Sequence, residues 1–141
     1  REEGLLVAGD HILPYIAPSL TPNIFDDNYR PLKIYLESLD KIEKLRCAEI
    51  YPGHGNSLSG VQERIEEIRA HHERRKNWFG GFLNNAAKTA REVAQEVFGE
   101  DLPDFEKFLA LNETFVYLQE LKSEDKISQK MQDNVFVYKV S

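Results

Sequence analysis

The feature that most constrains the fold is a short apolar run near the start of the chain, Leu5-Leu6-Val7-Ala8, which Gly9 and Asp10 follow at once. A run of this length that ends at a glycine is typical of a buried β-strand, and we expect a strand over 4–8. A lone strand exposes unpaired amide and carbonyl groups on both edges. The chain therefore has to build at least part of a sheet around this run.

A second strand and two helices are expected downstream. Residues 48–51 form another short apolar run, which Pro-Gly-His-Gly at 52–55 ends. Between the two runs, residues 31–45 carry apolar side chains at helical spacing. A capping-box pattern at 59–62 indicates the start of a further helix, which runs to about residue 76. Strand, helix, strand and helix in this order predict an α/β fold.

The remainder of the chain has a different pattern. A capping box at 89–92 starts a helix that Gly99 stops, and a second helical segment begins at Pro103. Residues 127–138 read as a β-hairpin. Helices followed by a terminal hairpin describe a winged-helix module, so we predict two domains, 1–76 and 77–141. The apolar core expected in the second domain consists of Val93, Val97, Phe105, Phe108, Phe115 and Leu118.

One polar side chain follows each predicted strand, Asp10 after the first and His54 after the second. The carboxyl ends of strands in α/β proteins converge on one crevice, where functional groups gather. A carboxylate and an imidazole are suitable ligands for zinc, manganese or iron. Both residues also fit ordinary tight turns, because glycine neighbours each of them. The spacing alone leaves both interpretations open.

The run 5–10, a helix, and then the run 48–55 together resemble the second half of the metallo-β-lactamase superfamily. More narrowly, they are similar to the glyoxalase II-like and β-lactamase-like-protein-2 branch, which appends a winged-helix domain. The resemblance covers nearly the whole chain and implies the C-terminal half of an αββα sandwich. It also implies that Asp10 bridges two metal ions and that His54 binds the second. The expected metal is zinc, with manganese or iron as alternatives.

The chain departs from the family pattern in one respect. The family's His-x-His-x-Asp-His motif, and a further ligand histidine before the bridging aspartate, do not occur in this sequence. Catalytic zinc sites usually have three protein ligands, and Asp10 and His54 supply two. The chain begins with Arg1, and its single methionine is Met131. We therefore expect a truncated fragment that binds little or no metal and is inactive alone.

Two further histidines, His11 and His72, are candidates for the wall of a substrate cleft. His11 follows the bridging position, and the resemblance implies no role for it. His71 and His72 are adjacent on a predicted helix, so they point about 100° apart and cannot grip one metal as an i, i+4 pair would. A half-buried His72 beside an exposed His71 is the plainer interpretation, and a packing role or a cleft wall is the functional one.

The function implied by the resemblance is metal-dependent hydrolysis of an ester, thioester or phosphoester centre by a dinuclear metal-bound hydroxide. The net charge of −6 disfavours nucleic acid as the main partner, and residues 89–141 hold 6 Lys and Arg against 11 Asp and Glu. The expected reading helix, about 112–123, offers Lys122 against Glu113 and Glu120. The alternative function is a non-catalytic winged-helix interaction module that binds protein or nucleic acid.

Composition also bears on the compartment and on assembly. No stretch approaches 18 consecutive apolar residues, so no membrane span is expected. We find no signal-peptide pattern, and a single cysteine, Cys47, cannot form an internal disulfide; both favour the cytoplasm. Open edges on the strands at 4–8 and 48–51 favour pairing between copies, a homo-oligomer formed through strand edges.

Overall fold

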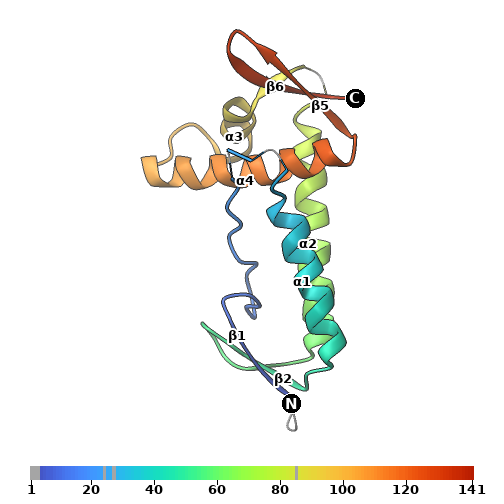
Figure 1. Ribbon diagram of the computed structural model, residues 1–141. Coiled ribbons are helices and arrows are strands. Elements are labelled where there is room, and N and C mark those ends of the chain that lie inside the picture. Colours follow the sequence, from blue (N-terminus) through green and yellow to red (C-terminus); the bar gives the residue numbers. More distant parts are fainter. Residues whose placement is uncertain (1–3, 24, 27, 85) are drawn as a thin grey trace. The chain divides into compact units, whose positions relative to one another are not determined.

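The computed structural model describes residues 4–23, 25, 26, 28–84 and 86–141. The described residues form both helices and strands, so the predicted mixed α and β class is confirmed (Figure 1). In chain order the elements are β1 (Leu5–Gly9), α1 (Pro31–Leu45), β2 (Glu49–Pro52), β3 (Leu58–Ser59), α2 (Val61–Gly81), β4 (Lys88–Thr89), α3 (Ala90–Phe98), α4 (Asp104–Ser123), β5 (Ile127–Gln132) and β6 (Val135–Val140).

These elements divide into two compact units. The first unit contains the chain up to Ser19 together with Ile34–Glu73, and the second contains Leu20–Lys33 together with Arg74–Ser141. Residues 20–33 and 74–76, which the sequence analysis put in the first domain, thus group with the second unit. Residues 1–3 of the predicted first domain lie outside the described residues.

The first unit has a three-stranded sheet in the order β1-β2-β3. β1 and β2 are parallel, with Leu6 opposite Ile50, and β2 and β3 are antiparallel. Two parallel neighbours need a crossover between them, and α1 belongs to that connection. The fully buried side chains of this unit come from both helices, from β2 and from the loop after β1, namely Ile12, Leu39, Ile50, Ile65 and Ile68.

Most of α1 and of α2 lies in this unit, and the two helices begin in different ways. α1 spans the predicted range and starts at Pro31, where a missing amide proton costs nothing. The capping box predicted at 59–62 is wrong, because Ser59 lies in β3 and the helix starts only at Val61. The side-chain amide of Gln62 instead donates a hydrogen bond to Glu43 on α1.

The second unit contains α3, α4 and an antiparallel sheet in the order β4-β6-β5. The capping box predicted at the start of α3 is confirmed: the Thr89 hydroxyl accepts the Glu92 amide, and the Glu92 carboxylate accepts the Thr89 amide. The predicted hairpin is also present, with Asp133 and Asn134 at its turn and φ values of 49° and 62°. Two consecutive positive φ angles are typical of a type I′ turn.

The expected core of the second unit is wrong in two places. Phe105 and Phe108 are 71% and 57% exposed. At about 100° per residue, Phe108 lies on the face of α4 opposite most of its buried side chains, whereas Phe105 lies close in angle to the buried Val116 but about three turns nearer the start of the helix. α4 carries apolar residues on both faces, so helical spacing alone could not select the buried one. The side chains that α4 buries are Ala110, Thr114, Val116, Tyr117, Leu118, Glu120 and Leu121.

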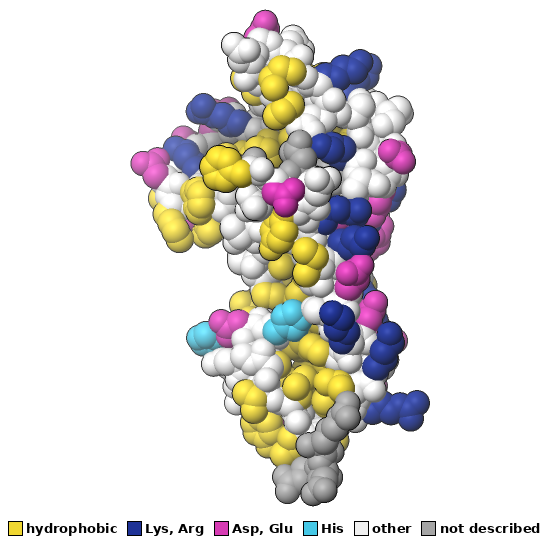
Figure 2. Space-filling view, viewed as in Figure 1, with side chains coloured by type: hydrophobic (Ala, Val, Ile, Leu, Met, Phe, Trp, Pro, Cys, Tyr) yellow, Lys and Arg dark blue, Asp and Glu magenta, His cyan; other side chains and the backbone are white. Residues whose placement is uncertain are grey.

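The surface also carries apolar groups elsewhere. On β1, Val7 is 84% exposed and Leu5 is 44% exposed, and apolar side chains are visible on the face shown in Figure 2. The apolar run predicts a buried strand, and β1 instead leaves part of its apolar surface uncovered. Within the part of the chain that the structure describes, no helix is long and apolar enough to cross a membrane.

Candidate metal centre

The carboxyl ends of β1 and β2 lie side by side, because the two strands are parallel neighbours with Gly9 opposite Pro52. The Gly53 amide donates a 2.7 Å hydrogen bond to the Gly9 carbonyl oxygen, which ties the two loops together where the strands end. Gly9 has φ = 54°, a backbone conformation that glycine adopts at no steric cost. The chain can therefore turn sharply between the strand and Asp10.

This arrangement brings together the two residues that the sequence analysis singled out. The Nδ1 atom of His54 lies 2.8 Å from Oδ1 of Asp10, although 44 positions separate them in the chain. Both side chains face solvent, with 62% of Asp10 and 79% of His54 exposed. An ionised carboxylate only accepts hydrogen bonds, so Nδ1 of His54 carries a proton in this contact, and the tautomer with its single proton on Nδ1 has a lone pair on Nε2.

The donor atoms of this pair fit a metal site in part. A carboxylate oxygen and an imidazole nitrogen are ligand types that zinc, manganese and iron accept, and both are accessible from solvent. Within the described ranges, however, no group of three or more His, Cys, Asp or Glu side chains is placed to hold a metal ion. Asp10 and His54 can thus form one side of a metal centre. The described residues place no third ligand side chain beside them.

The side chain of His11 contacts α1. Its Nε2 atom lies 2.6 Å from the Ser38 hydroxyl, and its ring packs edge-on against Tyr35 at 5.0 Å between centroids. The Tyr35 hydroxyl also donates a 3.0 Å hydrogen bond to the His11 carbonyl oxygen. Partial burial lowers the pKa of His11.

His72 is more deeply buried than the sequence analysis expected, with 4% of the residue exposed. Its ring packs edge-on against Tyr35 at 5.6 Å and against His71 at 5.4 Å. Burial, assisted by the neighbouring His71, lowers the pKa of His72 to about 4, so the ring is neutral at neutral pH. Burial likewise raises the pKa of Tyr35 to about 12. The two cleft candidates, His11 and His72, thus both contact Tyr35.

Sequence reasoning missed three residues that shape the loop after β1. Arg64 donates from Nε to the Leu13 carbonyl at 2.8 Å and from Nη2 to the Ile16 carbonyl at 3.1 Å. Tyr35 and Ser38, the other two, bind His11. In the sequence Tyr35 counted only as part of the apolar stripe of a helix. A hydrogen bond to a residue far away in the chain leaves no periodic signal that could have revealed any of the three.

Comparison with family models gives no match to this chain. Among curated proteins, it is 28% identical over 142 residues to a probable metallo-hydrolase, YqjP, of Bacillus subtilis, covering 99% of this chain and 44% of that protein. It is 31% identical over 122 residues to the beta-lactamase-like protein 2 homolog of Caenorhabditis elegans, covering 86% of this chain and 38% of that protein. An atrochrysone carboxyl ACP thioesterase of Emericella nidulans is 25% identical over 139 residues, with 96% and 42% covered.

Two solved structures share the fold. A beta-lactamase domain protein from Burkholderia ambifaria superposes with a TM-score of 0.89 at 26% identity, covering 99% of this chain and 42% of that one. A metallo-beta-lactamase family protein from Thermus thermophilus superposes with a TM-score of 0.82 at 29% identity, covering 99% and 43%. The chain therefore spans about two fifths of the length of the relatives that it matches.

Proposed function

The fold and the relatives identify this chain as part of a metallo-β-lactamase superfamily protein, and we propose that the protein which contains it is a metal-dependent hydrolase. The observation that carries this proposal is the 2.8 Å contact between Asp10 and His54 at the ends of two parallel strands. The name of one relative, a probable metallo-hydrolase, supports it.

The residues proposed to hold metal are Asp10, as the ligand of two ions, and His54, as the ligand of one. When bound, a divalent metal such as zinc lowers the pKa of water and polarises a carbonyl or phosphoryl oxygen. The contribution of this chain is to present a carboxylate and an imidazole side by side. The hydrogen bond between Gly53 and Gly9 keeps the two loops together. Manganese or iron could take the place of zinc at such a donor set.

For the substrate we favour a thioester or a related ester. One relative is named an atrochrysone carboxyl ACP thioesterase. The net charge of −6 makes the polyanionic backbone of RNA a poorer partner, although a phosphoester substrate belongs to the same proposal. A winged-helix module in the second part of the chain is proposed without a role in reading nucleic acid, since residues 89–141 hold 6 Lys and Arg against 11 Asp and Glu.

Activity is proposed for the full-length protein and not for these residues alone. Two ligands are fewer than a catalytic zinc site needs, and the sequence contains no His-x-His. We propose that the remaining ligands lie outside the 141 residues. The 141-residue chain should accordingly take up little zinc and hydrolyse none of the ester substrates.

The test compares the full-length protein with its Asp10→Asn and His54→Gln variants, and His71→Gln is the control because His71 is an exposed histidine on α2. Zinc content and hydrolysis of an acyl thioester, a nitrophenyl ester and a nitrophenyl phosphodiester are measured. Each ligand variant should lose activity by at least about 100-fold, the upper end of what loss of an outer-shell partner costs. The control should retain both zinc and activity.

Two outcomes would contradict the proposal. Wild-type levels of zinc and turnover in both ligand variants would remove Asp10 and His54 from the site. Absence of zinc and turnover in the full-length wild type would instead favour the alternative, a non-catalytic interaction module.

A further inference from the structure

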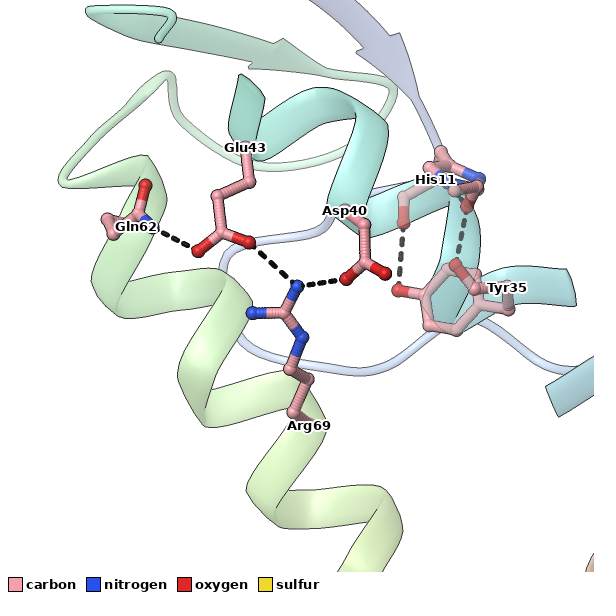
Figure 3. A network of polar contacts seen from close by, with 7 residues as sticks. His11, Tyr35, Asp40, Glu43, Gln62 and Arg69 are labelled. Atoms are coloured by element: carbon pink, nitrogen blue, oxygen red, sulfur yellow. Dashed lines mark hydrogen bonds and ion pairs between the residues drawn. The ribbon is translucent and has the colours of Figure 1, made fainter. Parts of the chain in front are cut away.

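His11, which follows Asp10, forms hydrogen bonds through its amide, its carbonyl and its ring. The His11 amide donates to the Ala8 carbonyl at 3.1 Å, which closes the turn after β1. The His11 carbonyl accepts the Tyr35 hydroxyl at 3.0 Å, and the His11 ring bonds to the Ser38 hydroxyl at 2.6 Å. Figure 3 shows His11 against Tyr35 of α1. Backbone and side chain of this one residue are thus both fixed.

The direction of the bond between His11 and Ser38 follows from counting protons. The Ser38 hydroxyl has one proton, and it donates that proton to the Tyr35 carbonyl at 2.5 Å. The Ser38 oxygen must therefore accept from His11, and Nε2 of His11 carries the proton. The proton count fixes the tautomer of His11. Ser38 lies one turn along α1 from Tyr35, so the two residues contact the same imidazole ring and fix its orientation.

We call Tyr35 and Ser38, which both bind His11, the His11 clamp. These two residues can hold His11 in place only if α1 is itself held in place, and contacts with α2 do this. Arg69 on α2 bonds to Asp40 at 2.5 Å and to Glu43 at 2.9 Å, two residues on α1, as Figure 3 shows. The buried ring of His72, also on α2, packs edge-on against Tyr35. The clamp on His11 is therefore anchored to both helices of the first unit.

The Asp10 carboxylate has little else to hold it. It is 62% exposed, and among the described residues its side chain bonds only to His54, which is itself 79% exposed. Two exposed side chains cannot fix each other strongly, since such a pair contributes little in water. The direction of Asp10 must then be set by the backbone on either side of it, at Gly9 and His11.

We propose that Tyr35 and Ser38 are positioning residues, which hold His11 so that Asp10 stays against His54 and the pair is preorganised to bind metal. The inference rests on the proposed function, because it assigns to α1 the outer support of that same metal site. Among the described residues, the side-chain hydrogen bonds of Tyr35 and Ser38 go to His11 and to each other, not to Asp10 or His54. They act through His11.

The test uses the full-length protein with two disrupting variants, Tyr35→Phe and Ser38→Ala. Tyr35→Phe keeps the ring that packs on His11 and His72 and removes only the hydroxyl. Ser38→Thr keeps a hydroxyl and is the rescue variant, and Tyr117→Phe is the matched control at a buried tyrosine of the second unit. The first measurement is zinc affinity by competition with a chromophoric chelator. The second is hydrogen exchange of the Gly53 amide in metal-free protein.

Each disrupting variant should bind zinc about 10- to 100-fold more weakly, as expected for loss of an outer-shell partner. The Gly53 amide should exchange about two- to tenfold faster, because one hydrogen bond of the clamp is lost. Ser38→Thr and Tyr117→Phe should resemble the wild type in both measurements. A purely structural role would lower the unfolding midpoint without this selective loss of zinc.

The outcomes separate the two proposals. If the wild type binds zinc and both disrupting variants bind it equally well, the clamp is overturned and the proposed function stands. If the wild type binds no zinc, the proposed function fails, and the clamp is judged on the Gly53 amide alone. Faster exchange in the variants then supports a clamp on the loop, and unchanged exchange overturns it.

Discussion

A Cβ atom on Gly53 would stand 2.4 Å from Oδ1 of Asp10. That is far inside the separation of about 3.5 Å at which carbon makes its closest favourable contacts. The same atom would lie 3.2 Å from the carbonyl carbon of Gly9, while the Gly53 amide already bonds to the Gly9 carbonyl oxygen. The carboxylate of Asp10 occupies space that only a glycine at 53 leaves free.

We predict that Gly53→Ala weakens zinc binding much more than it weakens the fold. The backbone around Gly9 is hydrogen-bonded, so the short Asp10 side chain has to swing away from His54 to make room. Zinc affinity of the full-length protein should fall by at least about tenfold. The free energy of unfolding should fall by about 1 kcal/mol, at the lower end for overpacking, because Asp10 can move into solvent. Chelator competition and urea unfolding measure the two quantities.

Gly81→Ala is the matched control for this substitution. A Cβ on Gly81 meets no atom within 4 Å, and the residue ends α2. Zinc affinity should be unchanged, and stability should be equal or slightly higher, since alanine favours helix more than glycine does. Zinc binding by Gly53→Ala at wild-type strength would show that the site does not need Asp10 in this position.

Buried His72 should make the chain sensitive to acid. Burial lowers its pKa from 6.5 to about 4 in the folded state. Above pH 6.5 the ring is neutral in both folded and unfolded chains and the stability is fully present. As the pH falls from 6.5 to 4, the unfolded chain binds the proton and the folded chain does not, so stability is lost. The loss should be on the order of 3 kcal/mol over this window.

His72→Gln tests this origin, because glutamine does not titrate. In urea unfolding at several pH values between about 7 and 4, the variant should lose less stability than the wild type. Some dependence should remain, since partial burial also lowers the pKa of His11. His71→Gln, at the exposed neighbour, should keep most of the dependence. Identical pH profiles for wild type and His72→Gln would contradict the assignment.

Local signals in the sequence were enough to predict several helices and turns, but not which face of α4 is buried. The helix at 31–45, the capping box at Thr89 and Glu92 and the hairpin turn depend on interactions between near neighbours in the chain, and all three are confirmed. The buried face of α4 depends on what packs against it. Phe105 and Phe108 satisfied the helical period and are nevertheless exposed.

At the candidate site, the sequence was enough to predict the residues that follow the strands, but not the residues that hold them in place. Asp10 and His54 follow strands directly, so parallel pairing alone brings them together, and the structure has them 2.8 Å apart. Their roles as ligands stay predictions. Tyr35 bonds to a backbone carbonyl 24 positions away, and no residue type or spacing encodes such a contact.

In the second unit, the ion pair between Arg30 and Glu120 should contribute measurably to stability. Nη2 of Arg30 lies 2.8 Å from Oε1 of Glu120, and only 10% of the glutamate side chain and 27% of the arginine side chain are exposed. Glu120→Gln should lower the free energy of unfolding by about 2 kcal/mol, since it leaves a largely buried guanidinium without its counter-charge.

The control for this pair is Lys107→Gln on the same helix. Lys107 lies 3.9 Å from a fully exposed Asp104, and exposed pairs contribute little in water. Urea unfolding should show no measurable loss for this variant. Equal effects of Glu120→Gln and Lys107→Gln would mean that burial gives the Arg30 pair no advantage.

The 141-residue chain should associate with itself through β1, and Val7→Lys should suppress this. β1 is an edge strand of its sheet, and Val7, 84% exposed, lies opposite Tyr51, which is 43% exposed. An open edge beside an uncovered apolar face favours pairing with a second copy. A lysine there should raise the dissociation constant by at least about tenfold, because burial of a valine stabilises by about 1.5 kcal/mol or more. Sedimentation velocity over a range of concentrations measures this dissociation constant.

The control is Ile34→Lys, which makes a similar change at a 51% exposed residue of α1. The backbone of a helix is already hydrogen-bonded within the helix, so this variant should leave association unchanged. A wild type that stays monomeric throughout, or equal effects of the two lysines, would exclude β1 as the contact.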